Sequence, residues 1–262
     1  MDFKLYNDDC FNVFPLIPDK SVDAIICDLP YGTTDCKWDS ILPLEKLFAR
    51  YRMIVKNNGA IILMASQPFT SILVSYWVKN FKVEWIWQKN AGSNFGTCKF
   101  QPMKEHESVL VFSNGGGKLT YNPIMQKRTE SGAERVKTKI KGGKASGTGG
   151  VYSNGGLKEY IQTPNELRYP SSIQKFNRER GLHPTQKPVA LMEYLVRTYT
   201  NETNTVLDNC MGSGTTGVAC KLTNRKFIGI EKEPEYFNIA QKRISETQAG
   251  GLFFNSNTST EL

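Results

Sequence analysis

The stretch from Thr205 to Glu231 constrains the fold more than any other part of the chain. An apolar run ends in Asp208 and is followed by the turn Gly212-Ser-Gly-Thr215, a helical segment at 216–222 and a second apolar run that ends in Glu231. A strand, a turn, a helix and a second strand in this order form a βαβ unit, in which the two strands are parallel. The chain is therefore predicted to be an α/β protein with a mostly parallel sheet.

The same alternation continues along the rest of the chain. Apolar, β-branched runs predict strands at 3–6, 22–27, 60–64, 82–87 and 107–112, and helical spacing predicts helices at 40–55, 70–79, 188–198 and 234–245. Ser40 is expected to cap the helix at 40–55, and Asn57-Asn58-Gly59 to end it. A chain of 262 residues is long enough for one large domain with an insertion.

The net positive charge of the chain lies in one segment, residues 113–182. It contains 13 Lys and Arg against 5 Asp and Glu, whereas the remainder has 20 of each. So local an excess predicts contact with a polyanion, and the alternative is a solvated basic loop. Aromatic residues interleave with the cations and are suited to stacking on bases. The cations expected to contact nucleic acid are Arg128, Arg135, Lys137, Lys139, Lys141, Lys144, Arg168, Lys175, Arg178 and Arg180.

A second polar stretch, Asp28-Leu-Pro-Tyr31, follows the predicted strand at 22–27. Pro30 cannot continue a ladder, so this strand should end there, at the sheet edge where ligands of open α/β proteins bind. The Asp28 carboxylate and the Pro30 carbonyl offer two acceptors for the hydrogens of a base amine. Tyr31 is suited to stacking on a base that has left the duplex. The alternative is an ordinary turn at a strand end.

The glycine turn and Glu231 predict a nucleotide-like ligand. Glycines allow the backbone to approach the ligand closely. A carboxylate at the end of the next strand can accept hydrogen bonds from both hydroxyls of a ribose. Gly212, Gly214 and Gly217 also fit the dinucleotide fingerprint, which leaves an NAD-dependent oxidoreductase as an alternative. Asp208 before the turn favours a cationic ligand, such as a sulfonium with an amino-acid tail.

Several classes of protein are not expected. No apolar run approaches the about 20 residues of a membrane span, and the first residues lack the pattern of a signal peptide. The six cysteines show no Cys-x-x-Cys spacing and are interpreted as reduced thiols of a cytoplasmic protein. The two histidines are 77 positions apart, so no metal site is expected.

Three motifs in this order resemble the β-class of S-adenosylmethionine-dependent DNA amino-methyltransferases, the adenine-N6 and cytosine-N4 enzymes of bacteria and phages. They are Asp28-Leu-Pro-Tyr31, His183-Pro-Thr-Gln-Lys-Pro188 and Asp208-x-x-x-Gly-Ser-Gly-Thr215, with Trp87-x-Lys89 and His106-Glu107 as further matches. The resemblance implies a Rossmann-like, mostly parallel seven-stranded sheet with one antiparallel strand and a circularly permuted motif order. It covers about residues 3–112 and 183–245, so a methyltransferase domain is expected at 1–112 and 183–248. The charge and composition of 113–182 predict a target-recognition insertion, and residues 249–262 are expected to form a flexible tail.

The resemblance also implies roles for individual residues. Asp28, Pro30 and Tyr31 would be catalytic and would hold a flipped base. S-Adenosylmethionine would be the cofactor, and the residues expected to bind it are Asp9, Cys10, Asp28, Lys187, Asp208, Gly212, Ser213, Gly214, Thr215 and Glu231. Lys187 would close over the cofactor. Asn209-Cys210 stands where the family commonly has Pro-Phe, which predicts a less rigid turn.

Asp at the first position of the catalytic motif usually accompanies adenine in this family, so adenine-N6 methylation of duplex DNA is favoured over cytosine-N4 methylation. RNA or protein-glutamine methylation and a DNA-binding module without catalysis are more distant alternatives. A cognate restriction enzyme and a homodimeric state are both compatible with the resemblance.

Overall fold

The computed structural model describes residues 2–32, 40–115, 118–137, 167–179, 181 and 186–250, except for the side chains of 135–137. It separates into two compact units, Met1–Asn122 with Ser171–Leu262, and Pro123–Pro170. The second unit is shorter than the insertion predicted at 113–182, because residues on both sides of it belong to the first unit.

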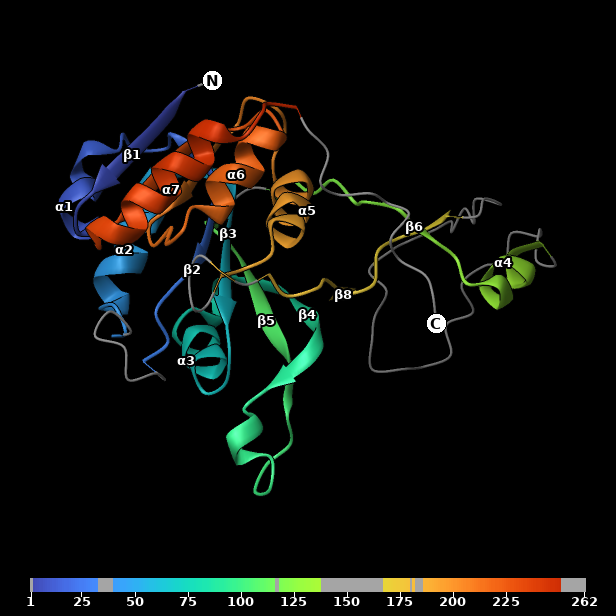
Figure 1. Ribbon diagram of the computed structural model, residues 1–262. Helices are drawn as coiled ribbons and strands as arrows, with labels where there is room; N and C mark the ends of the chain where they lie inside the picture. Colours follow the sequence, from blue (N-terminus) through green and yellow to red (C-terminus); the bar gives the residue numbers. More distant parts are fainter. Residues whose placement is uncertain are drawn as a thin grey trace. The chain divides into compact units, whose positions relative to one another are not determined.

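The first unit is built on a sheet of eight strands in the order β1-β10-β9-β2-β3-β5-β4-β8 (Figure 1). The strands are β1 (Phe3–Asn7), β2 (Val22–Asp28), β3 (Val55–Ala65), β4 (Phe81–Ser93), β5 (Lys104–Ser113), β8 (Ile173–Lys175), β9 (Thr205–Asp208) and β10 (Lys226–Glu231). Within the described part of this sheet, β5 alone runs antiparallel to its neighbours. The predicted sheet type is confirmed. It has eight strands rather than seven, because β8, assigned from the sequence to the insertion, pairs with β4.

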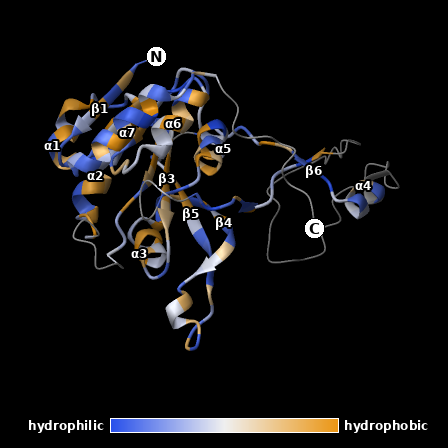
Figure 2. Cartoon of the chain, in the orientation of Figure 1, coloured by the Kyte–Doolittle hydropathy of each residue, from blue (hydrophilic) through white to orange (hydrophobic). Residues whose placement is uncertain are grey.

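Helices cover both faces of this sheet. They are α1 (Cys10–Val13), α2 (Leu44–Ile54), α3 (Phe69–Tyr76), α5 (Val189–Tyr199), α6 (Thr215–Leu222) and α7 (Pro234–Glu246), with short 3-10 turns η1 (Phe14–Leu16), η2 (Val78–Asn80) and η3 (Phe95–Thr97). Helices α1, α2 and α3 share one apolar cluster with Ile230 of β10. Phe227 is an odd number of residues from Ile230 on the same strand, so its side chain points to the opposite face of the sheet. There it lies close to Gly217 of α6. Hydrophobic residues accordingly run along the central strand β3 (Figure 2).

Two expectations about α2 and β3 were wrong. Pro43, not Ser40, is the N-cap of α2, and the helix ends at Ile54. Strand β3 begins at the next residue and continues through Asn57-Asn58-Gly59, which was expected to end the helix. A side chain at Gly59 would place its Cβ 2.7 Å from the carbonyl oxygen of Asp23 on β2. This glycine therefore serves the close approach of two strands.

Polar residues gather at one edge of the sheet because of strand direction. Asp28, Asp208 and Glu231 end three parallel strands, β2, β9 and β10. Since β5 is antiparallel, its beginning, with Glu107, lies at the same edge, opposite Trp87 of β4. Strands β4 and β5 continue past this edge as a long hairpin (Figure 1).

The second unit has little regular structure among its described residues. Strand β6 (Gln126–Lys127) pairs antiparallel with β7 (Leu167–Arg168), and α4 spans Glu130–Lys137. In neither unit does the described part contain a helix long and apolar enough to cross a membrane.

Candidate functional site

A cavity of about 560 Å³ opens at the carboxyl edge of the sheet. Its size is typical of sites for small organic ligands, which are roughly 300–1,000 Å³. The residues singled out from the sequence that line it are Asp9, Cys10, Asp28, Pro30, Tyr31, Arg178, Lys187, Asp208, Gly212, Ser213, Thr215 and Glu231. Gly214 does not line it. The two polar stretches, far apart in the sequence, therefore share one cavity.

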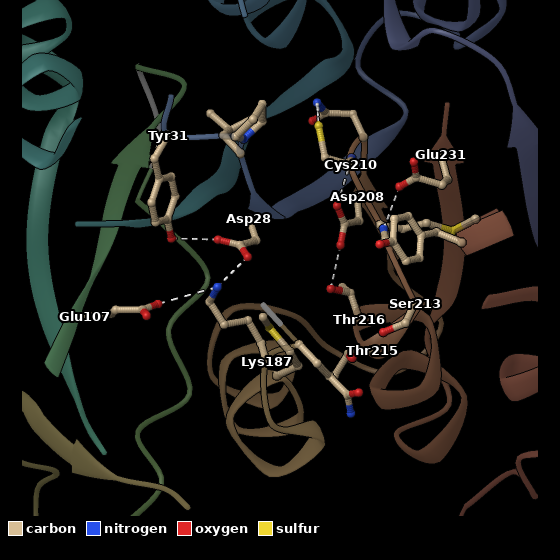
Figure 3. A pocket seen from close by; sticks show the side chains of 18 of the residues that line it. Asp28, Tyr31, Glu107, Lys187, Asp208, Cys210, Ser213, Thr215, Thr216 and Glu231 are labelled. Carbon is tan, nitrogen blue, oxygen red and sulfur yellow. Dashed lines mark hydrogen bonds and ion pairs between the residues drawn. The ribbon is translucent and has the colours of Figure 1, made fainter. Parts of the chain in front are cut away.

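On one side of the cavity, Asp28 belongs to a chain of alternating charges (Figure 3). The Tyr31 hydroxyl donates to Asp28 Oδ1 at 2.7 Å, and Lys187 Nζ donates to Asp28 Oδ2. Lys187 Nζ also lies 3.5 Å from Glu107 Oε2. The other carboxylate oxygen of Glu107 accepts from Lys89 Nζ at 2.6 Å. The negative charges of two carboxylates are thus balanced by the positive charges of two ammonium groups.

Burial and pairing act in opposite directions on the pKa values of this cluster. Burial raises the pKa of Asp28, although Lys187 opposes the change. Burial lowers the pKa of Lys187, but the carboxylates of Asp28 and Glu107 outweigh it and the net pKa is raised. Burial raises the pKa of Glu107, but Lys187 and Lys89 outweigh it and the net pKa is lowered. Lys187 and Glu107 are therefore held in their charged forms.

Sequence reasoning gave Glu107 and Lys89 no role, and placed Lys187 over the cofactor. In the structure Lys187 lines the cavity, and its ammonium contacts Asp28 and Glu107. The signal that could have found Glu107 is topological. A charged residue at the start of an antiparallel strand lies where its parallel neighbours end.

Tyr31 has one ring face occupied within the protein. Its ring stacks on Phe69, with centroids 5.5 Å apart and planes inclined by 29°. Lys187 Nζ lies 5.8 Å from the centroid of the Tyr31 ring. The ring face that packs on Phe69 is therefore not available for stacking on a ligand.

The glycine turn forms the other side of the cavity. Gly212 and Gly214 have φ values of +52° and +78°, a region that favours glycine. A Cβ on Gly214 would also lie 2.8 Å from the Cβ of Ala240 in α7. Arg243 of the same helix donates to the Ser213 carbonyl oxygen at 2.8 Å and to the Thr215 hydroxyl at 3.2 Å. Arg243, which the sequence did not single out, therefore fixes the turn from behind.

Asp208 is buried where β9 meets this turn. Its Oδ2 accepts from the Thr216 hydroxyl at 2.7 Å, and its Oδ1 accepts from the Cys210 amide at 3.1 Å. Burial raises the pKa of Asp208 to about 7, against these hydrogen bonds, which lower it. Burial therefore disfavours the charged form of this carboxyl.

Asn209 is anchored rather than loose. Its side chain is buried, and its Oδ1 accepts from the hydroxyl of Tyr51 in α2 at 2.5 Å. The expectation of a less rigid turn at Asn209-Cys210 considered only local sequence. A hydrogen bond from a distant helix supplies the restraint that a proline would give.

Two further cavity carboxylates, Glu231 and Asp9, accept hydrogen bonds from backbone amides. Glu231 Oε2 accepts from Gly212 N at 2.8 Å, and Oε1 accepts from Glu233 N at 2.9 Å. Asp9 caps α1, since its Oδ1 accepts from Phe11 N at 2.9 Å. A carboxylate has about four acceptor positions, so both groups keep the capacity to bind a ligand hydroxyl or amine.

The cations predicted to bind nucleic acid are distributed over both units. Arg128 and Arg168 lie in the second unit, whereas Lys175 is exposed on β8 of the first. Arg178 lines the cavity. Outside the described residues lie Lys139, Lys141, Lys144 and Arg180, with the side chains of Arg135 and Lys137.

Residues 22–242 match the N6/N4 DNA methylase family. The chain belongs to this family. The resemblance to β-class amino-methyltransferases stated from the motifs is thereby confirmed, and the NAD alternative is not supported.

Individual relatives agree with this placement. The type II methyltransferase M.HpaI of Haemophilus parainfluenzae is 27% identical over 268 residues, which span 93% of this chain and 74% of that protein. The crystal structure of an M1.HpyAVI–SAM complex is 29% identical with a TM-score of 0.63, covering 92% of this chain and 99% of that one. The cytosine-N4-specific PvuII DNA methyltransferase has a TM-score of 0.64 over 99% of this chain and 89% of its own. At 14% identity it shares the fold alone.

Asp208 makes the stability of the ligand-free protein depend on pH. An unfolded Asp titrates near 3.8, whereas the folded one titrates at about 7. Between these values the folded state retains a proton that the unfolded state has lost. The contribution of Asp208 to the free energy of unfolding is therefore full below about pH 4 and falls as the pH rises to about 7. Relative to Asp208→Asn, the free energy of unfolding of the wild type should fall by about 4 kcal/mol over this range. Urea unfolding at several pH values measures it. Asp19→Asn, an exposed control, should track the wild type, and a pH-independent difference for Asp208→Asn would contradict the prediction.

Glu107→Gln should destabilise the fold, because it leaves Lys89 and Lys187 with one carboxylate fewer in a buried cluster. Removing one partner of a buried pair costs about 3–5 kcal/mol. Glu105→Gln is the matched control, because Glu105 is exposed two residues earlier on β5, and it should change stability by less than about 0.5 kcal/mol. Equal urea midpoints for the two variants would show that the cluster contributes nothing.

Proposed function

We propose that this protein is a site-specific DNA methyltransferase that transfers the methyl group of S-adenosylmethionine to the exocyclic N6 of adenine. The observation that carries the proposal is the shared cavity. Asp28 and Pro30, at the end of β2, lie in one space with the glycine turn and with Glu231. Membership of the N6/N4 DNA methylase family agrees with this chemistry.

The residues of the glycine-turn side fit S-adenosylmethionine. The Glu231 carboxylate, oriented by two backbone amides, is placed to accept hydroxyls of a ribose. The buried Asp208 faces the same cavity and, when ionised, would offset the positive charge of an amino-acid tail. Asp9 and Cys10 lie on the cavity wall, where they would meet the adenine end of the ligand. When bound, the cofactor supplies an electrophilic methyl group on a sulfonium.

On the other side, Asp28 and Pro30 would hold the amine that receives the methyl group. The nitrogen of a base amine is a poor nucleophile because its lone pair is delocalised into the ring. Two acceptors that bind its hydrogens favour the pyramidal, reactive form. The Asp28 carboxylate keeps free acceptor positions beyond its bonds to Tyr31 and Lys187, so the amine can be bound without breaking either.

Lys187 and Glu107 would act as positioning residues for Asp28. The ammonium of Lys187 offsets the charge of the half-buried Asp28 carboxylate, and Glu107 fixes that ammonium through a second ion pair. A bond from the amine nitrogen to the methyl carbon would form as the carbon–sulfur bond breaks and leaves a neutral thioether. Positive charge would then build on the nitrogen, whose proton would leave late. The pKa of Asp28, raised by burial, suits it to stabilise that charge and to take the proton. Holding the two reactants together supplies much of the rate, about 7–11 kcal/mol of the barrier.

Adenine is proposed on the basis of Asp28 alone. In this family Asp at the first motif position usually accompanies adenine, and Ser accompanies cytosine. A cytosine-N4 enzyme shares the fold, so the fold does not distinguish the two bases. Identification of the methylated nucleoside therefore decides between adenine and cytosine.

The DNA duplex is proposed to contact the basic segment 113–182. Antiparallel pairing of β6 with β7 places Arg168 opposite Gln126, next to Lys127, and the side chains of Arg168 and Lys127 are exposed. Such cations are suited to phosphates. We propose a cognate restriction enzyme as the functional partner. It would cleave the same site when unmethylated, and methylation by this protein would protect the site from cleavage. We place the activity in the cytoplasm.

Methyl transfer from labelled S-adenosylmethionine to unmethylated DNA, followed by nucleoside digestion, tests the function directly. N6-methyladenine is the expected product. Asp28→Ala should lower kcat by about 10²-fold or more because the amine loses an acceptor. Asp19→Ala is the surface control. N4-methylcytosine would keep the mechanism and overturn the choice of base, and full activity of Asp28→Ala would overturn the role of Asp28.

Binding of DNA phosphates by the second unit predicts a steep salt dependence of DNA affinity. The slope of log K against log salt concentration becomes shallower by about 0.9 for each phosphate that the protein no longer neutralises. The variant Lys127→Ala/Arg168→Ala should therefore reduce the slope by roughly 1–2, as measured by fluorescence anisotropy of a labelled duplex. Lys82→Ala, on an exposed position of β4, is the control and should leave the slope unchanged. A slope unaltered by the double variant would show that these two cations do not bind phosphate.

A further inference from the structure

The hairpin between β4 and β5 exposes two aromatic side chains. Phe95 is 79% exposed and Phe100 is 90% exposed, whereas every other described phenylalanine is buried or half-buried. All residues from Asn94 to Met103 are exposed. In the part of the chain that the structure describes, these two rings therefore have no core to join.

The tip that carries these rings is ordered by its own hydrogen bonds. Thr97 N donates to the Asn94 carbonyl oxygen at 3.0 Å, and Phe100 N donates to the Thr97 carbonyl oxygen at 2.9 Å. The Gln101 amide donates to the Thr97 hydroxyl at 2.8 Å. These bonds form a compact turn that holds both phenylalanines outward.

The base of the tip belongs to the cavity. Ser93, Asn94 and Lys104 line it together with Asp28 and Lys187. Phe95 is the next residue after Asn94, so the exposed rings begin where the cavity wall ends. Figure 1 shows the hairpin extending from the same edge at which the strands end. The tip therefore begins at the wall of the cavity.

The charge of the hairpin fits a polyanion. Residues 94–103 carry one exposed cation, Lys99, and no acidic residue. Lys89 is buried against Glu107, and Lys104 is half-buried. A second copy of this chain would meet an equally basic tip if the two hairpins faced each other. Exposed aromatics beside an exposed lysine are instead suited to DNA, where the cation meets a phosphate and the rings meet bases.

We infer that the hairpin tip 94–103 contacts the DNA duplex beside the target base and inserts Phe95 or Phe100 into the stack that the base leaves. This inference rests on the proposed function, since it requires a base to leave the duplex. Apolar side chains that enter a base step replace part of the missing stacking. Extruding a base costs unstacking and unpairing energy, and the wedge offsets that cost. The tip is thus a second DNA contact, separate in sequence from the basic segment 113–182.

The first test compares methyl transfer by two variants. Phe95→Ala/Phe100→Ala should lower kcat/KM on unmethylated duplex DNA by about tenfold or more, because base–aromatic stacking is removed. Binding of S-adenosylmethionine should not change. Val78→Ala is the matched control. Val78 is also a largely exposed apolar residue, but it precedes β4 at the opposite end of that strand from the tip. An equal kcat/KM for the double variant and the control would overturn the inference.

The second test reports contact without catalysis. Cys98 is a free, exposed thiol within the tip. Its reaction with N-ethylmaleimide, followed by mass spectrometry of the Cys98 peptide, should slow by about tenfold when a duplex is bound, because stacked bases and backbone cover the tip. The reagent is neutral, so the charge of DNA does not itself repel it.

The outcomes separate this inference from the proposed function. In one outcome, anisotropy shows that a duplex at saturating concentration is bound while the rate of Cys98 modification by N-ethylmaleimide does not change. That outcome would overturn the hairpin contact and leave the proposed function intact. A wild-type protein that neither binds nor methylates DNA would instead overturn the proposed function, and the hairpin contact with it. Protection of Cys98 together with the decrease in kcat/KM would support both.

Discussion

The contact between the Lys187 ammonium and the Asp28 carboxylate is the interaction on which the arrangement of the site depends. A buried carboxylate at a strand end is costly unless a cation offsets its charge. Lys187 supplies that cation, and Glu107 and Lys89 extend the compensation across β4 and β5. The cluster thereby ties the segment before α5 to three strands of the sheet.

The antiparallel direction of β5 makes this compensation possible. A parallel β5 would carry Glu107 away from the edge at which Asp28 ends β2. Because β5 runs against β3 and β4, its first residues lie at the cavity. Strand direction, rather than sequence proximity, therefore sets the electrostatics of the Asp28 side of the site.

The opposite side of the cavity is stabilised by contacts from behind the ligand-facing surface. Arg243 of α7 fixes Ser213 and Thr215, and Tyr51 of α2 fixes Asn209. Neither side chain is needed to touch a ligand for the turn to be held in place. Such contacts pre-organise a ligand site and reduce the conformational freedom that binding removes.

The sequence by itself determined the α/β class, the parallel βαβ unit at 205–231 and the residues of both polar stretches. These depend on local patterns, namely apolar runs, glycine turns and acids at strand ends. The tertiary structure decided what lies beside them. The pairing of Lys187 with Asp28 and Glu107, the tether from Tyr51 to Asn209 and the addition of β8 to the sheet join residues far apart in the chain. Gly59 is a further example, because the sequence around it predicted a helix end, whereas in the structure it allows β2 and β3 to approach closely. A pattern within one segment carries no information about which distant segment packs against it, and that is why these contacts required the fold.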